Sequence, residues 1–224
     1  MLSLDFYYFT FSTYILMVGI SFIISFVIFY QISKNDYNKI DLIYIYILNI
    51  FGFAIGSKLL SLIVNNREIT IYNFINSGYS FIGGILGSLL IIAVYCKKYK
   101  LDLKNILSRF TVIYPLIYSI SKIGCFLNGC CGGSIMNLNF PLQLIDSIIM
   151  LELFLILLLQ FKKQNRLNLI TFLIVFGIIR FFEDFFRDLR IVIIYNLTLY
   201  QLICIALVIT GVFFFIQTIR NVEK

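Results

Sequence analysis

Long apolar stretches separated by short polar segments make up almost the whole sequence. A helix needs about 20 apolar residues to cross the hydrocarbon core of a bilayer. Stretches of that length recur along the chain, which predicts about seven transmembrane helices. Their expected ranges are 6–30, 42–64, 79–96, 110–129, 142–160, 168–186 and 197–217. The fourth is the least regular, because Pro115 interrupts it and glycines follow.

Composition points to the bilayer as the solvent of this chain. Of its 224 residues, 61% are hydrophobic and only 13% are charged, and the mean hydropathy is +0.97. A soluble domain carries about a quarter charged residues, so an aqueous globular fold is excluded. The first apolar stretch follows Asp5 rather than basic residues, which favours a retained helix over a signal peptide. We expect an all-α, polytopic membrane protein whose residues 1–224 form a single integral membrane domain.

The positive charges are distributed asymmetrically between the two sides of the predicted bundle. Alternate connecting segments, counted from residues 31–41, contain twelve Lys and Arg, whereas the opposite set contains three, Arg67, Arg187 and Arg190. Lys and Arg collect in cytoplasmic loops, so the N-terminus is predicted outside and the C-terminus inside. The same rule explains the net charge of +7 without a nucleic-acid partner.

Costly polar residues within the apolar stretches lie mainly in the outer half of the predicted bilayer. An ionisable group in lipid costs about 3 kcal/mol on insertion scales, so such groups commonly face a functional cavity. Glu152, nearer the middle, is the exception. The outer set consists of Tyr14, Lys58, Lys122, Gln143, Asp146, Arg180, Glu183, Asp184, Arg187 and Gln201. This one-sided distribution favours a site for outer-leaflet lipid over an ion path across the membrane.

Arg180, Glu183, Asp184 and Arg187 have the spacing of one helical face. This face is open to two interpretations. One is a salt-bridged helix end at the membrane surface. The other is an anion clamp, because the guanidinium group is a permanently charged, planar fork that suits phosphate.

Glycines and cysteines mark two further segments. Gly83 and Gly84 in FIGGILG favour close helix packing, although backbone lying against a lipid headgroup is a second interpretation. The segment SKIGCFLNGCCGGS contains Cys125, Cys130 and Cys131. A disulfide, a metal site and incidental apolar cysteines all remain open, although the pattern is weak for metal because histidine is absent.

Several segments, in order, resemble the prolipoprotein diacylglyceryl transferases. The similarity runs from TYILMVGI to NLTLYQL and is carried between them by GSKLLSLI, YSFIGGILG, SKIGCFLNGCCGG, FPLQLIDS and FGIIRFFEDFFRD. That family comprises seven-helix bacterial inner-membrane enzymes that move diacylglycerol from phosphatidylglycerol to the thiol of a lipobox cysteine, releasing glycerol 1-phosphate. The chain departs from the family pattern in places. Ile82 stands at the family's histidine position, Lys122 at the signature arginine, and Cys125 and Cys130 at a signature asparagine and acid.

The resemblance implies a diacylglyceryl transferase of the bacterial cytoplasmic membrane, with its site facing the outer leaflet and no cofactor. Its expected partners are phosphatidylglycerol, other membrane lipid and a lipobox-containing prolipoprotein or another thiol peptide. We predict that Arg180 grips the phosphate, Lys122 supplies a second cation, and Glu183 or Asp184 orients Arg180 or takes the thiol proton. The predicted substrate-binding residues are Tyr14, Lys58, Gly83, Gly84, Asn128, Gln143 and Arg187.

Two alternatives come from other functional classes. A repurposed or inactive relative could bind lipid or a membrane peptide without chemistry, which Ile82 and Lys122 favour. A small-solute transporter is disfavoured, because the pattern lacks interrupted helices at mid-membrane and its polar residues lie on one side.

Overall fold

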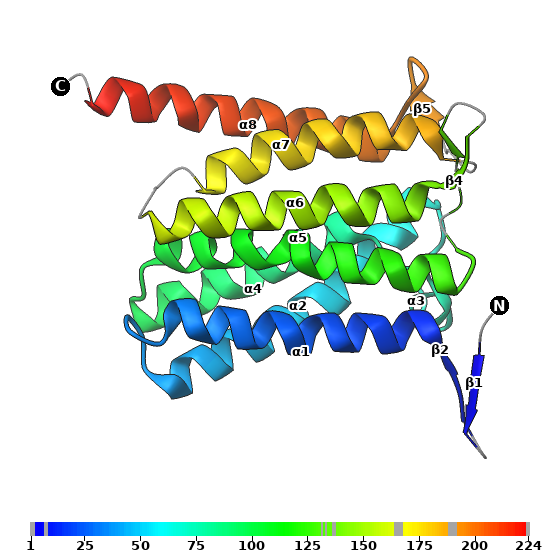
Figure 1. The fold of residues 1–224 in the computed structure, drawn as a ribbon, viewed down its shortest axis with the longest axis horizontal. Helices are drawn as coiled ribbons and strands as arrows, with labels where there is room; N and C mark the ends of the chain where they lie inside the picture. The colour runs from blue at the N-terminus through cyan, green and yellow to red at the C-terminus, as the bar shows by residue number, and fades with distance from the viewer. Residues whose placement is uncertain are drawn as a thin grey trace. The chain divides into compact units, whose positions relative to one another are not determined.

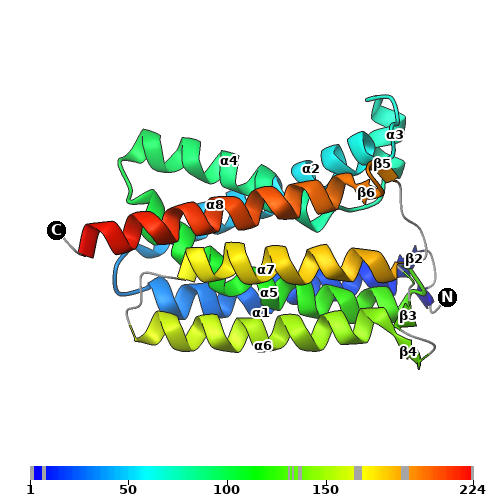
Figure 2. The same ribbon diagram turned by 90° about the horizontal axis from the view of Figure 1, so that it is seen from above.

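A computed structural model describes residues 3–6, 9–130, 132, 134–135, 138–163, 168–187 and 192–222. Helices dominate this part of the chain (Figures 1 and 2). They are α1 (Thr13–Ser33), α2 (Lys39–Val64), α3 (Ile71–Asn76), α4 (Phe81–Tyr99), α5 (Leu103–Leu127), α6 (Leu142–Lys162), α7 (Asn168–Glu183) and α8 (Leu199–Val222). A short 3-10 helix, η1 (Asp184–Phe186), continues α7. Residues Cys131, Arg166, Arg190 and Lys224 lie outside the described residues.

The structure confirms an all-α, multi-pass membrane protein. Each predicted apolar stretch contains one long helix, and six of these helices are long and apolar enough to cross a bilayer. The remaining one, α7, has 16 residues, fewer than the 20 or so that a straight span needs. The number of spans and the orientation of the termini therefore stay predictions. Apolar side chains cover the outside of α1 and α8, where only 17% and 11% of the most apolar window is buried.

The structure differs from the predicted pattern in several places. The first helix begins at Thr13 rather than near residue 6, because β1 (Ser3–Phe6) pairs with β2 (Phe9–Ser12) as an antiparallel hairpin. Two further hairpins, β3 (Ser134–Ile135) with β4 (Leu138–Pro141) and β5 (Val192–Ile194) with β6 (Leu197–Thr198), precede α6 and α8. Pro115 lies inside an unbroken α5, where 72% of the most apolar window is buried. That packing offsets the lost backbone hydrogen bond.

The described helices group into two compact units. Unit 1 comprises Met1–Ser25 and Thr111–Lys224, and unit 2 comprises Phe26–Phe110. Helices α1 and α5 each contribute residues to both. In unit 1, the last turns of α5 and α7 and the first turns of α6 and α8 lie at the same end, beside the strands (Figure 1).

Unit 2 is built around the close contact between α2 and α4. A Cβ atom on Gly52 would lie 2.6 Å from the Cα of Ser88, and one on Gly56 would lie 2.7 Å from the Cα of Gly87. Real Cβ atoms do not approach backbone so closely, so these helices can pack this way only with glycine at the contact. The packing interpretation of the glycine segments is confirmed.

The start of α5 is fastened to the α1–α2 connection within the same unit. Arg109 is 2% exposed, and its guanidinium donates to the carboxylate of Asp36 and to the side chain of Asn105. The guanidinium carbon also lies 5.1 Å from the ring centre of Tyr37. Burial raises the pKa of the Tyr37 hydroxyl, and the charge of Arg109 opposes that shift. This contact anchors the connection that precedes α2.

Candidate active site

Lys122, near the end of α5, bridges carboxylates from two other helices. Its Nζ lies 2.5 Å from Oδ2 of Asp146 on α6 and 3.1 Å from Oε1 of Glu183 on α7. These three residues are 5%, 2% and 6% exposed, respectively. Buried charges persist only when they are paired and hydrogen-bonded, and this lysine meets that condition with both partners. Three helices of unit 1 therefore converge on one ammonium group.

Glu183 also interacts with Arg180 of its own helix, with Arg187 just after η1 and with Tyr118. Arg180, one helical turn before Glu183, pairs through Nη1 with Oε2 of that carboxylate. Arg187, one turn after Glu183, lies with Nη2 3.6 Å from Oε1. The Tyr118 hydroxyl donates to Glu183 at 3.1 Å and accepts from Arg180 Nη1 at 2.7 Å. The carboxylate thus gathers three cations at one point. We call Tyr118, Lys122, Asp146, Arg180, Glu183 and Arg187 the cation cluster.

The cation cluster has an excess of positive charge. Its three cations face two carboxylates, which leaves one formal positive charge in a buried environment. The Tyr118 ring adds a favourable contact, since Lys122 Nζ and Arg180 Cζ lie 5.1 and 5.5 Å from its centre. The Arg187 side chain is 20% exposed, against 5% for Arg180, and is the more accessible arginine. One monovalent anion would balance this charge.

Asp184 belongs to a different network from Glu183. Its Oδ2 accepts a hydrogen bond of 2.6 Å from the Thr198 hydroxyl, and Gln201 Oε1 accepts one of 2.9 Å from the Thr198 backbone N–H. Gln201 is fully buried and donates weakly, at 3.4 Å, to the carbonyl of Phe181. These contacts tie the end of α7 to the start of α8. Of the four residues predicted on one face, the structure brings together Arg180, Glu183 and Arg187.

Three other predicted site residues of unit 1 lie around the same helix ends. Gln143 is buried and donates 2.9 Å from Nε2 to the carbonyl of Cys130, which links α6 to the segment after α5. The backbone of Asn128 continues the last turn of α5 through a bond to Gly124. Gly124 packs against α1, where its Cβ position would lie 3.4 Å from the Cα of Tyr14. Their substrate-binding roles remain predictions.

Lys58, Gly83 and Gly84 belong to unit 2, and their contacts there are structural. Lys58 Nζ donates to the carbonyls of Phe74 and Ile75 at 3.0 and 2.8 Å and, more weakly, to that of Ser77 at 3.3 Å. It therefore caps the end of α3. A Cβ on Gly83 would lie 2.5 Å from Leu60, and one on Gly84 would meet the ring of Phe53 at 2.6 Å.

Sequence comparison places this chain in a known family over nearly its whole length. The sequence profile described as prolipoprotein diacylglyceryl transferase matches residues 2–217. The chain belongs to the prolipoprotein diacylglyceryl transferase family. This confirms the resemblance seen in the motifs.

Individual proteins similar to this chain are named as transferases of this family. A phosphatidylglycerol–prolipoprotein diacylglyceryl transferase of Clostridium tetani is 27% identical over 206 residues, covering 82% of this chain and 83% of the relative. One from Rickettsia bellii is 26% identical over 204 residues, covering 78% of each. A relative numbered 2 from Clostridium perfringens is 26% identical over 204 residues, covering 79% and 78%. The similarity thus extends over most of the length of these transferases.

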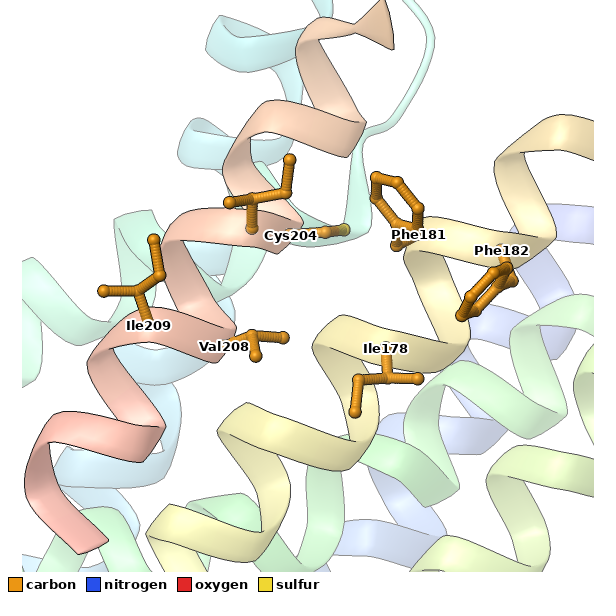
Figure 3. Close-up of a pocket in the computed structure, with 7 residues that line it drawn as sticks. Ile178, Phe181, Phe182, Cys204, Val208 and Ile209 are labelled. Atoms are coloured by element: carbon orange, nitrogen blue, oxygen red, sulfur yellow. The ribbon is translucent and has the colours of Figure 1, made fainter. Parts of the chain in front are cut away.

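An apolar pocket is formed by α7, the helix that carries Arg180 and Glu183, and by α8 of this transferase-family chain. It has a volume of about 200 Å³ and lies between α7 and α8 (Figure 3). Phe181 and Phe182, which follow Arg180 directly, form one wall, and Cys204, Val208 and Ile209 lie opposite. Arg180 and the pocket thus share α7 but lie on different faces of it, because Phe181 and Phe182 are turned by about 100° and 200° from Arg180 around the helix.

Two groups of the cluster were outside the predicted site set. Tyr118 precedes Lys122 by four residues, so helical spacing could have placed it on the same face. Asp146 belongs to the predicted set of costly outer polar groups, but the sequence assigns it no role.

Cys96, Cys125, Cys130 and Cys204 are thiols, and the described residues contain no group of three or more metal-binding side chains.

Proposed function

We propose that this chain transfers the diacylglyceryl group of phosphatidylglycerol to a cysteine thiol of a lipoprotein precursor. Family membership and the names of its relatives support this reaction. The observation that carries it is the cation cluster, in which Lys122, Arg180 and Arg187 are gathered around one buried carboxylate.

The cluster suits the charge changes of this transfer. Phosphatidylglycerol brings one negative phosphodiester, which would balance the excess positive charge of the cluster. A thiolate attacks the glyceryl carbon, the carbon–oxygen bond to phosphate breaks, and a second negative charge develops on the leaving phosphate. Fixed cations stabilise such a charge most in a desolvated site. Arg180 is the phosphate clamp, Lys122 the second cation, and the more exposed Arg187 lies at the mouth.

The apolar pocket between α7 and α8 fits the other half of the substrate. It is lined by aliphatic, aromatic and thiol side chains of α7 and α8. We propose that an acyl chain of the lipid occupies this pocket, along the helix that also carries Arg180. We propose that the lipid comes from the outer leaflet, that the thiol belongs to a lipobox cysteine, and that no nucleic acid takes part.

Transfer in vesicles tests the proposal. The purified chain is reconstituted in phosphatidylglycerol–phosphatidylcholine vesicles with a synthetic lipobox peptide, and mass spectrometry measures the diacylglyceryl adduct. Loss of one charge-stabilising donor typically slows an enzyme about 100- to 1,000-fold, so Arg180→Ala should lose at least that much. Arg220→Ala, at the exposed end of α8, controls for the loss of an arginine elsewhere. Full activity of Arg180→Ala would refute the clamp.

A lipid-binding protein without chemistry is the second candidate. The observation that favours it is that Lys122, Arg180 and Arg187 are already paired with carboxylates of the cluster. Such a protein would retain phosphatidylglycerol through purification but would give no peptide adduct and would not complement a strain lacking the transferase. Adduct formation by the wild-type chain excludes this candidate.

A further inference from the structure

The proposed reaction needs an acceptor for the thiol proton. A free cysteine has a pKa of about 8.5, so most substrate thiol is protonated at neutral pH and must lose its proton to attack. The chain contains no histidine among its 224 residues. Within the cation cluster, where Lys122 is paired with two carboxylates, the carboxylates are the side chains that can accept a proton near neutrality once their surroundings favour the neutral form.

The carboxylates in and around the cation cluster differ in the number of cations and hydrogen-bond donors that contact them. Glu183 receives Lys122, Arg180, Arg187 and Tyr118, which together stabilise its charge and disfavour protonation. The carboxylate of Asp184 accepts the Thr198 hydroxyl in the network toward α8. Glu152, the other acid of α6, lies on an exposed face of that helix.

Asp146 is ion-paired with Lys122, a cation that the phosphate of the lipid substrate would also attract. Lys122 Nζ contacts its Oδ2 at 2.5 Å, and the Glu183 carboxylate adjoins it from α7. Tyr118 of α5 and Arg180 of α7 are the further ionisable groups that interact electrostatically with it. Asp146 is 2% exposed, so its charge depends on Lys122 rather than on water. An ammonium group shared with a phosphate would leave this carboxylate poorly compensated.

We infer that Asp146 takes the proton of the substrate thiol after the lipid phosphate has drawn Lys122 toward itself. This rests on the proposed transferase function. The S–H bond breaks and its proton binds a carboxylate oxygen of Asp146. The sulfur electron pair forms the bond to the glyceryl carbon, and the carbon–oxygen electron pair leaves on the phosphate. The proton then passes from Asp146 to the released glycerol phosphate, which restores the carboxylate and its pair with Lys122.

The test is the pH dependence of transfer by Asp146→Asn in the vesicle assay, from pH 6 to 9. General base catalysis is worth about 100- to 10,000-fold, so we expect a loss of at least 100-fold in kcat at pH 7. The loss should shrink as the pH approaches the pKa of the thiol itself. KM for phosphatidylglycerol should not rise, because the three cations are retained. Asp146→Glu should keep the wild-type pH profile at a reduced rate.

Controls separate this role from packing. Ser147→Ala, the next residue of α6, removes a buried hydrogen bond to Ser119 outside the cluster and should change the rate less than threefold at every pH. Asp146 is not the base if Asp146→Asn loses activity by a constant factor across the pH range or loses it only in KM. The same holds if Asp146→Glu shows the pH profile of Asp146→Asn rather than that of the wild type. A wild-type chain that forms no adduct refutes the proposed function before any variant is compared.

Discussion

Glu183 and Asp184 are consecutive carboxylates whose side chains enter separate networks. Glu183 Oε1 lies 3.1 Å from Lys122 Nζ, whereas Asp184 Oδ2 lies 2.6 Å from the Thr198 hydroxyl. The division falls where α7 ends and the 3-10 turn of η1 begins. Adjacent residues of a helix point about 100° apart, so these two neighbouring carboxylates face different parts of the protein.

Glu183→Gln and Asp184→Asn should therefore differ strongly although they are neighbours. Removing one partner of a buried ion pair costs about 3–5 kcal/mol, and Glu183→Gln leaves three cations without their shared carboxylate. We expect it to lower the thermal stability and abolish transfer. Asp184→Asn keeps an oxygen that accepts from Thr198 and should cost about 1 kcal/mol. Thermal unfolding in detergent and the vesicle assay measure both.

Equal effects of the two substitutions would contradict the division into two networks. Asn in place of Asp184 also serves as the matched control, since it removes one negative charge from the same segment. A transfer rate of Asp184→Asn within about threefold of wild type, corresponding to less than 1 kcal/mol, is the expected result.

Tyr118→Phe tests the link between Arg180 and Glu183. The substitution keeps the ring under Lys122 and removes the hydroxyl that accepts from Arg180 and donates to Glu183. Hydrogen bonds to charged groups contribute about 1.5–3 kcal/mol, so transfer should fall about 10- to 100-fold. Ser121→Ala is the control, because within the described part of the chain that hydroxyl bonds to the carbonyl of Ile117 in its own helix. Comparable losses in both variants would show that the bridge is not required.

The helices were predictable because bilayer thickness sets a length that the sequence displays directly. The predicted range 142–160 corresponds to α6 at Leu142–Lys162, for example. The hairpins were not predictable, because a strand of two to four residues depends on a partner that no periodicity reveals. Thr13 begins α1 where the pairing of β1 with β2 ends, and this pairing shortened the predicted helix.

The site was predictable in its cations and less so in their partners. Lys122 and Arg180 could be identified because a charge within an apolar stretch is costly and therefore conspicuous. Which carboxylate each one meets depends on the rotation of separate helices about their axes, which a single sequence does not specify. The sequence therefore assigns no role to Asp146. Tyr118 has the pattern of an ordinary aromatic core residue, and only the structure shows its hydroxyl between the charges of Arg180 and Glu183.

Lys58→Met should release the segment that follows α2. The ammonium group donates to the carbonyls of Phe74 and Ile75 and, less closely, to that of Ser77, and it lies 4.7 Å from the ring centre of Tyr79. Losing these bonds leaves the end of α3 uncapped, since Met has no donor. Trypsin should then cut at the exposed Arg67 at least tenfold faster than in wild type. Lys58→Arg, which retains donors, should fall in between, and unchanged cleavage of Lys58→Met would rule out the cap.

Gly56→Ala and Gly19→Ala should change stability in opposite directions. A methyl group on Gly56 would meet the backbone of Gly87 at 2.7 Å, so α2 and α4 must separate to admit it. Overpacking of this kind costs about 1–3 kcal/mol. Gly19, in the middle of α1, has nothing within 4 Å of its Cβ position. Alanine there should stabilise the helix by up to about 1 kcal/mol, because glycine is the poorer helix former. Thermal unfolding of both variants in the same detergent measures the difference in stability. If Gly56→Ala is as stable as Gly19→Ala, α2 and α4 do not pack through their glycines.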